Sequence, residues 1–104
     1  MKLLTKAITE GFDRQGNTDG KPDSEKKVIA KFFHPLGSAT WYAIEYNKEW
    51  KKFLAYVTGL GYDELGNVSL TELENTIVLG LGVERDKDWD SNTTLEQVKT
   101  GEVR

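Results

Sequence analysis

The stretch KFFHPLGSATWYAIEY (residues 31–46) contains two apolar and aromatic runs on either side of a turn with Pro35 and Gly37. This pattern predicts a β-hairpin. Residues 28–33 and 40–46 alternate between two faces, as expected for strands. Two strands that pair early in a short chain would organise a sheet, and their aromatic side chains would supply much of its core.

Two further segments extend the predicted sheet, and a helix follows it. Residues 52–58 alternate like the first two strands, and residues 65–68 form a shorter run after the glycine-rich loop 59–61. The Ser69 to Glu72 segment is a capping-box pattern. Leu70, Leu73, Ile77 and Val78 then share one helical stripe that ends before Gly80. We therefore predict an α+β fold, in which an antiparallel meander of three to four strands carries a helix on one face.

Short helices are predicted at both ends of the chain. Apolar residues within 2–12 fit a short amphipathic helix, and a second capping box from Thr93 to Glu96 begins a C-terminal helix that Gly101 would end. Residues 13–25 are polar and predict a flexible loop. Residues 80–86 are typical of a loop or a short edge strand.

Length and composition limit the possible functions. A chain of 104 residues fits one domain (1–104), with its core in 26–90 and a short helix and tail in 91–104. Seventeen acids against fourteen bases give a net charge of −3, and the cations cluster only in pairs, which disfavours nonspecific nucleic-acid binding. Without cysteine, disulfides and thiolate zinc sites are excluded. Residues 1–9 are too short for a signal peptide or membrane span, so we expect a cytoplasmic protein.

Several motifs share their order and spacing with one family. They are Lys31 to Pro35, Gly37, Thr40 to Tyr42 with Glu45, Glu64 to Gly66, Ser69-Leu70, Glu72 to Glu74, and Gly82 to Asp86. From about Lys27 to Trp89 the chain resembles the family catalogued as domain of unknown function 2958. The resemblance implies an occurrence on bacterial plasmids, integrative elements and phages, and it implies no defined activity. The chain departs from the family pattern at Leu54, at Asn67 and beyond Asp86.

The Glu84-Arg85-Asp86 triplet lies in one of these motifs, in a predicted loop. An arginine there can clamp a carboxylate, and the two acids can bind a cation or a basic partner. An arginine flanked by acids is also typical of an ion-pair network that holds a loop to a sheet. Both interpretations stay open, and the structural one is the commoner.

Two further patterns point weakly to metal or acid–base chemistry. Asp86, Asp88 and Asp90 alternate like the first half of a calcium loop, but the glycine and the final glutamate of such a loop are missing, which favours a solvated acidic turn. His34 is the single histidine, and Glu45 on the paired strand is a possible partner for it. One histidine is poor evidence for a metal, so we favour a role in turn packing or a solvent-exposed side chain.

Aromatic side chains on the strands suggest a docking surface. Phe33, Trp41, Tyr56 and Trp50 would form an exposed patch if they share the sheet face that the helix at Ser69 leaves open. The N-terminal helix could instead cover that face and make these residues part of the core.

No catalytic constellation or cofactor loop is visible, so we expect a non-catalytic module without cofactor that binds another protein, as an accessory factor of a mobile element. Its surfaces would be the aromatic patch and the loop from Glu84 to Asp86. One alternative is a metal- or small-molecule-dependent enzyme that uses His34, Glu45, Glu84 and Asp86. Another is an acidic nucleic-acid mimic built from Asp63, Glu64, Glu72, Glu74, Asp86, Asp88 and Asp90. An exposed sheet edge would also permit an edge-strand dimer.

Overall fold

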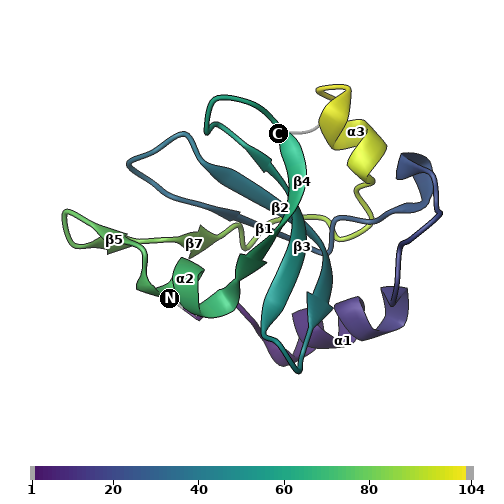
Figure 1. Cartoon of the computed structure of the whole chain (residues 1–104), viewed down its shortest axis with the longest axis horizontal. Helices are drawn as coiled ribbons and strands as arrows, with labels where there is room; N and C mark the ends of the chain where they lie inside the picture. The colour runs from purple at the N-terminus through teal and green to yellow at the C-terminus, as the bar shows by residue number, and fades with distance from the viewer. Residues whose placement is uncertain (1, 103–104) are drawn as a thin grey trace.

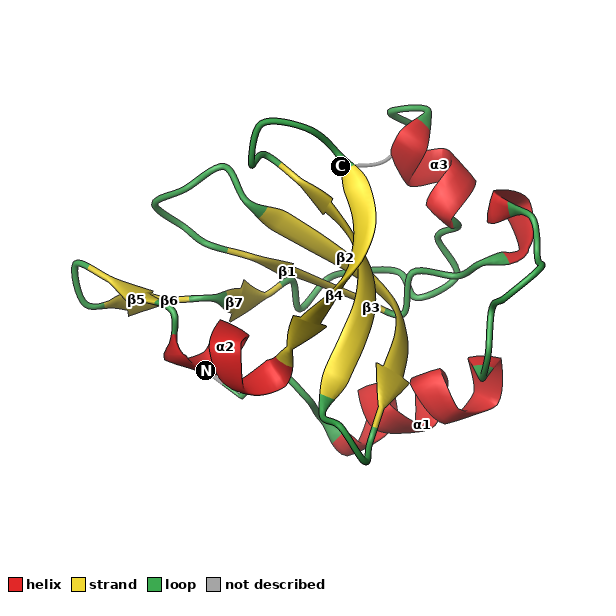
Figure 2. Cartoon of the chain, in the orientation of Figure 1, coloured by secondary structure: helices red, strands yellow, loops and turns green. Residues whose placement is uncertain are grey.

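The computed structural model describes residues 2–102, which form an antiparallel sheet with three helices around it (Figures 1 and 2). The sheet has five strands in the order β4-β3-β2-β1-β7. Its strands are β1 (Ala30–Phe33), β2 (Thr40–Asn47), β3 (Lys52–Thr58), β4 (Glu64–Ser69) and β7 (Glu84–Arg85). The helices are α1 (Lys6–Gln15), α2 (Leu70–Asn75) and α3 (Leu95–Lys99), with a 3₁₀ turn η1 (Asp23–Glu25). The predicted α+β class is confirmed.

The sheet has one strand more than predicted, because the chain returns after α2 to the free edge of β1. In β7, Arg85 lies opposite Phe32 and Glu84 lies opposite Phe33. Two residues are too few to show an alternating pattern, so this strand could not be distinguished from a loop in the sequence.

A separate two-stranded hairpin, which we call the arm, projects from the body beside β7 (Figure 1). It consists of β5 (Ile77–Val78) and β6 (Leu81–Gly82), joined by Leu79 and Gly80. The predicted helical stripe through Ile77 and Val78 is therefore wrong. The helix ends at Asn75, and the β-branched pair followed by a turn with glycine pairs as strands instead.

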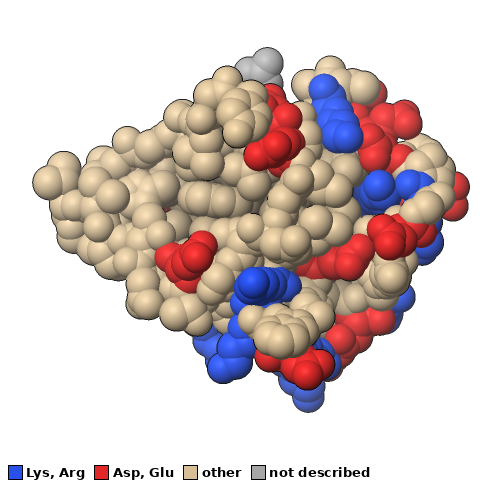
Figure 3. Space-filling model, viewed as in Figure 1, with Lys and Arg blue, Asp and Glu red and all other residues tan. Residues whose placement is uncertain are grey.

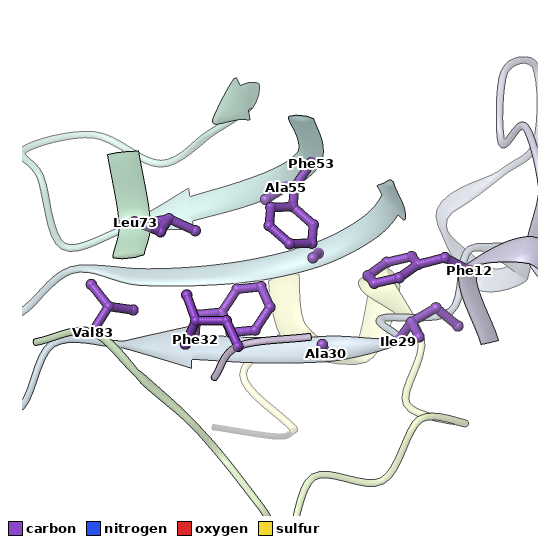
Figure 4. Close-up of a cluster of buried hydrophobic side chains, with 10 residues drawn as sticks. Phe12, Ile29, Ala30, Phe32, Phe53, Ala55, Leu73 and Val83 are labelled. Carbon is purple, nitrogen blue, oxygen red and sulfur yellow. The ribbon is translucent and has the colours of Figure 1, made fainter. Parts of the chain in front are cut away.

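One face of the sheet carries the larger core, and we call it the α1 face. Ala30, Phe32, Ala43, Phe53 and Ala55 point into it and are buried. Phe12 of α1 closes one end of this cluster, and Leu73 of α2 and Val83 close the other (Figure 4). The ring centroids of Phe53 lie 5.1 Å from Phe32 and 5.8 Å from Phe12. Burying each such ring contributes about 1.5–3 kcal/mol.

The opposite face, the α3 face, has a smaller core. Val28, Tyr42 and Ile44 are buried there against Leu95 and Val98, with α3 as the cover. Both faces of the sheet are therefore covered. The sequence left open whether the N-terminal helix covers the face opposite the helix at Ser69; in the structure α1 and α2 share one face, and α3 covers the other.

The N-terminal caps of the helices are close to their predicted places. The Ser69 hydroxyl accepts a hydrogen bond from the Glu72 amide, as the first capping box requires. The second box begins one residue later than predicted, with Thr94 and Gln97 as the reciprocal pair. Thr93 is buried, and its carbonyl accepts from the Val28 amide, so it joins the C-terminal segment to the start of the sheet.

Candidate functional site

A hollow at the β1–β7 edge brings several of the predicted site residues together. It encloses about 810 Å³, and we call it the edge hollow. Phe33 and His34 line it from the end of β1, and Glu84, Arg85 and Asp86 line it from β7 and the residue that follows. Strand pairing causes this meeting, since β7 adds to β1 with Glu84 opposite Phe33.

Arg85 binds the backbone of the N-terminal segment. Its Nη1 donates to the Lys2 carbonyl at 2.6 Å and lies 3.5 Å from the Leu3 carbonyl. Leu3 is fully buried in the core of the α1 face. These bonds support the structural interpretation of the triplet. The expected ion-pair network would use carboxylates, whereas these two bonds are to backbone carbonyl groups.

In the acidic segment after Arg85, two aspartate carboxylates accept hydrogen bonds from backbone amides two residues further along the chain. Asp86 accepts from the Asp88 amide at 3.0 Å, and Asp90 accepts from the Asn92 amide at 2.9 Å. Lys31 lies 3.9 Å from the other Asp86 oxygen. Within residues 2–102 no group of three His, Asp or Glu side chains could hold a metal ion. The calcium-like spacing therefore produces two Asx turns.

Trp89 anchors this acidic segment on the α3 face. Its indole nitrogen donates to the Val28 carbonyl at 2.8 Å, and its ring lies 5.8 Å from the Tyr42 ring. The Lys31 ammonium lies over both rings, 5.5 Å from the Trp89 centroid and 5.8 Å from that of Tyr42. Trp89 thereby holds residues 86–92 against the sheet, and we call this segment the strap.

His34 is a buried strut between two turns. The Leu36 amide donates to Nδ1 at 3.1 Å, so the ring proton lies on Nε2 and is donated to the Leu81 carbonyl at 3.0 Å. Both ring nitrogens are therefore occupied, and the histidine joins the β1–β2 turn to the arm. This arrangement agrees with the predicted role in turn packing.

Glu45 lies away from His34, so the four residues of the enzyme alternative do not converge. It accepts hydrogen bonds from the amide and hydroxyl of Thr18, at the other end of β2. His34 is bonded to Ala39, and six residues of strand from Ala39 to Glu45 span roughly 20 Å. The sequence suggested this pair because residues on paired strands can be neighbours, but the register separates them.

The predicted aromatic patch is divided by the sheet. Trp41 lies opposite Phe32 and packs on the α1 face. Tyr56 lies opposite Tyr42 and packs on the α3 face. Phe33 follows Phe32 in β1 and therefore points to that side of the sheet as well, where it lines the edge hollow. Trp50 is exposed in the β2–β3 turn. These residues therefore form no common docking surface.

The acids of the mimic alternative are also divided. Glu72 and Glu74 lie on α2, which covers the α1 face through Leu73. Asp86, Asp88 and Asp90 lie in the strap that Trp89 holds on the α3 face. These two groups of acids lie on opposite faces of the sheet, so the predicted set does not share one continuous face.

The sequence did not single out the arm as a surface. Its four large apolar residues are all exposed: Ile77 by 58%, Val78 by 48%, Leu79 by 89% and Leu81 by 43%. Leu79 has a φ of 51°, in the left-handed region, and Gly80 has a φ of 80°. The β-branched pair Ile77-Val78 followed by Leu79-Gly80 was the sequence pattern that favours a hairpin here. The same residues also fitted the helical spacing that begins at Leu70, so the helix was predicted instead.

Charge gathers at the other end of the molecule. In Figure 3 the acidic and basic side chains lie over α1, α2, α3 and the neighbouring loops, and the end that carries the arm is nearly free of them. Asp23 connects η1 to α3 at this charged end, because its carboxylate lies 2.8 Å from the Lys99 ammonium of α3. It also lies 3.5 Å from the ammonium of Lys26. The hydrogen bond from Lys99 is the main reason that the pKa of Asp23 is lowered from its usual value.

The pKa of Tyr46 is shifted as well. Its ring packs against Phe53 and Phe12, and burial, with a smaller contribution from the nearby Glu74 charge, raises the pKa of the phenol above its usual value. Neither Asp23 nor Tyr46 lines the edge hollow. In the part of the chain that the structure describes, no helix is long and apolar enough to span a membrane.

Comparison with curated proteins and with solved structures gives no match to either. Comparison with protein families gives a match over residues 3–100, nearly the whole chain. The match is wider than the span of about 27–89 on which the sequence resemblance rests, so the terminal helices are part of the family pattern. The chain belongs to the family described as protein of unknown function DUF2958.

Proposed function

We propose that this protein is a non-catalytic module that docks another protein through the tip of the arm. The observation that carries the proposal is Leu79, a large apolar side chain that is 89% exposed on a backbone in the left-handed region. Such a conformation costs about 1–2 kcal/mol for a residue other than glycine. Backbone strain of this kind collects at functional sites, where it has a use other than folding.

The turn chemistry sharpens this argument. Val78 lies opposite Leu81, so Leu79 and Gly80 form a two-residue hairpin turn with positive φ at both positions. Asn or Asp is the usual residue at the first position of such a turn. A leucine there gives up turn stability and displays an apolar side chain to solvent.

The surroundings of Leu79 indicate the chemistry of the partner. Residues 75–83 contain no charged side chain, and neither do residues 32–44, which include the neighbouring β1–β2 turn with the exposed Leu36. We propose that the partner is a protein with an apolar, uncharged pocket or groove, since an uncharged apolar surface is complementary to another of its kind.

The arm is held in place before a partner arrives. The hydrogen bond from His34 to the Leu81 carbonyl joins β6 to the body, and α2 contacts β6 on its other side. A preorganised surface loses less conformational entropy on binding than a mobile one. His34, which the enzyme alternative treated as a catalytic candidate, thus acts in this proposal as a support for the docking tip.

The family resemblance gives this proposal a biological setting. In it the protein is a cytoplasmic accessory factor of a plasmid, integrative element or phage. The edge hollow, with Glu84 and Arg85 of β7 and the following Asp86, lies near the arm and would form the polar rim of the interface.

A photo-crosslinking amino acid at position 79 tests the docking surface directly. In cells that naturally contain the chain, we expect a discrete crosslinked protein from position 79 and none from position 48, which lies in the β2–β3 turn at the charged end. Equal crosslinking from both positions, or none from either, would contradict the proposal. A crosslinked product that contains only this chain would replace it by self-association.

A further inference from the structure

A second surface, independent of the arm, lies between α1 and the strap. Two adjoining hollows of about 470 and 350 Å³ share Gly11, Arg14, Ile29 and Ser91, so they are continuous. We call the pair the basic trough. α1 forms one wall, residues 85–92 form the other, and Ile29 lies between them.

The charge of the basic trough is opposite to that of the whole protein. Five basic side chains line it, Arg14, Lys21, Lys27, Arg85 and Lys87, against two acidic ones, Glu25 and Asp86. The local charge is therefore +3 on a chain whose net charge is −3. The cations come from three distant parts of the sequence, and the sequence therefore showed only isolated bases.

Most of these cations are not neutralised by the chain itself. Elsewhere, Lys48 binds Asp13 at 2.7 Å and Lys99 binds Asp23 at 2.8 Å. Within residues 2–102, the side chains of Arg14, Lys21, Lys27 and Lys87 have no acidic partner within 4.0 Å. The Asp86 carboxylate, in contrast, already accepts from the Asp88 amide and faces Lys31.

Arg14 lies at the junction of the two hollows, and its guanidinium passes beside Gly11. A Cβ at Gly11 would lie 3.0 Å from Ile29 Cγ2 and 3.8 Å from Arg14 Nη2. The first distance shows that a side chain at position 11 would crowd Ile29 unless Ile29 shifted by a few tenths of an ångström. The second shows that the guanidinium folds back one turn over Gly11, as long side chains on a helix do, and so lies along the trough.

From this geometry we propose that the basic trough binds a small oligophosphate, either free or as the phosphate tail of a nucleotide. The planar guanidinium of Arg14 suits phosphate oxygens, and the ammonium groups of Lys21, Lys27 and Lys87 add point charges along the trough. The apolar side chains of Ala7, Ile8 and Ala30 also line the larger hollow, beside the cations. A nucleotide base could lie against them when one is present.

Calorimetric titration of the full chain at low ionic strength tests this proposal, with tripolyphosphate, ATP and adenosine as probes. We expect tripolyphosphate and ATP to bind and adenosine alone not to bind. Equal affinity for the first two would place recognition in the phosphates, and tighter binding of ATP would add a contact with the base. Both results support the trough as an oligophosphate site.

Three variants locate the site, each without one positive charge. Arg14→Gln and Lys87→Gln remove a cation from opposite walls and should each weaken tripolyphosphate binding about tenfold. Lys6→Gln is the matched control, because Lys6 lies on the same helix but does not line the trough, and it should change the affinity less than about twofold. Thermal unfolding of each variant, monitored by circular dichroism, checks that the fold is intact.

Three results would overturn the proposal. The first is the absence of binding by both tripolyphosphate and ATP. The second is an equal loss in all three variants, which would show diffuse attraction to a charged surface. The third is binding of a single-stranded oligonucleotide without binding of the small oligophosphates, which would make the trough a nucleic-acid surface.

Discussion

Two turns of this protein place a residue other than glycine in the left-handed region, and they differ in what the strained residue does for the fold. Lys51 and Leu79 both have a φ of 51°. In the β2–β3 turn, the Lys51 carbonyl accepts the amide of Leu70, the first residue of α2. In the arm, no hydrogen bond joins Leu79 to an element outside the hairpin, as far as residues 2–102 show.

The backbone strain at Lys51 has a use within the fold, whereas that at Leu79 has none that the hydrogen bonds of residues 2–102 show. Lys51 holds the start of a helix, and the charged side chains around it stay in solvent. Leu79 supports nothing in the chain and exposes an apolar side chain where asparagine would be favoured. A use outside the chain is the simplest explanation, and it is the basis of the docking proposal.

The largest expected difference between the two regions is in packing. Phe53→Ala, on the strand that follows the β2–β3 turn, should lower the free energy of unfolding by about 3–5 kcal/mol, because the ring is fully buried against Phe12, Phe32 and Tyr46. Leu79→Ala should change it by less than about 0.5 kcal/mol. Urea unfolding of both variants measures this difference, and a large loss for Leu79→Ala would show that the arm is part of the core.

Two glycines extend the comparison to the backbone. A Cβ at Gly59 would lie 1.9 Å from the Ser38 carbonyl oxygen, so Gly59→Ala should cost about 3 kcal/mol by forcing two loops apart. A Cβ at Gly80 in the arm meets nothing within 4 Å, so Gly80→Ala should cost only the strain of its positive φ, about 1 kcal/mol. Chemical denaturation of the two variants measures how much each substitution lowers the free energy of unfolding. Equal decreases would mean that the loops at Gly59 and Ser38 move apart without cost.

Arg85 marks the boundary between the packed body and the edge hollow. Arg85→Gln removes the charged donor to the Lys2 and Leu3 carbonyls and should cost about 1–2 kcal/mol. Amide hydrogen exchange of the N-terminal segment should accelerate more than that of the arm. Unchanged exchange at Leu3 would show that Arg85 does not hold the N-terminal segment in place.

The smallest effect is expected at the charged end and depends on pH. The pKa of Asp23 is lowered in the folded protein, so its contribution to stability is present above its usual value of 3.8 and is lost as pH falls through the lowered pKa. Asp23→Asn should therefore destabilise the protein slightly at pH 7, by less than about 1 kcal/mol because the pair is partly exposed, and should have no effect in strong acid. Thermal unfolding from pH 7 to 2 measures it, and a difference that grows toward low pH has the wrong sign.

The sequence predicted the parts of the fold that depend on long alternation. Residues 31–46 gave the hairpin, and residues 52–58 gave the next strand, because seven alternating positions are enough to define a face. The arm and β7 contain two residues per strand, and their pairing depends on tertiary contacts that no local pattern contains.

The candidate site could be predicted only in part, for a related reason. Glu84 to Asp86 were predicted as candidate binding residues from a motif, but their position beside Phe33 and His34 depends on the β1–β7 register. The partners of Arg85 lie 82 and 83 residues away in the sequence. The aromatic patch was wrong because the register places Phe33 and Trp41 on opposite faces, and neither strand alone reveals that register.

Leu79→Asn tests the central claim most directly, with Leu60→Asn as the matched control at another exposed leucine. Asparagine suits the positive φ, so Leu79→Asn should keep the stability or raise it by up to about 1 kcal/mol. The crosslinking experiment at position 79 first identifies the partner. In pull-downs from the same cells, Leu79→Asn should no longer capture that protein, whereas Leu60→Asn should still capture it. Retention of that protein by Leu79→Asn, or a loss of stability in the variant, would contradict the account, since Leu79 would then serve the fold and not the partner.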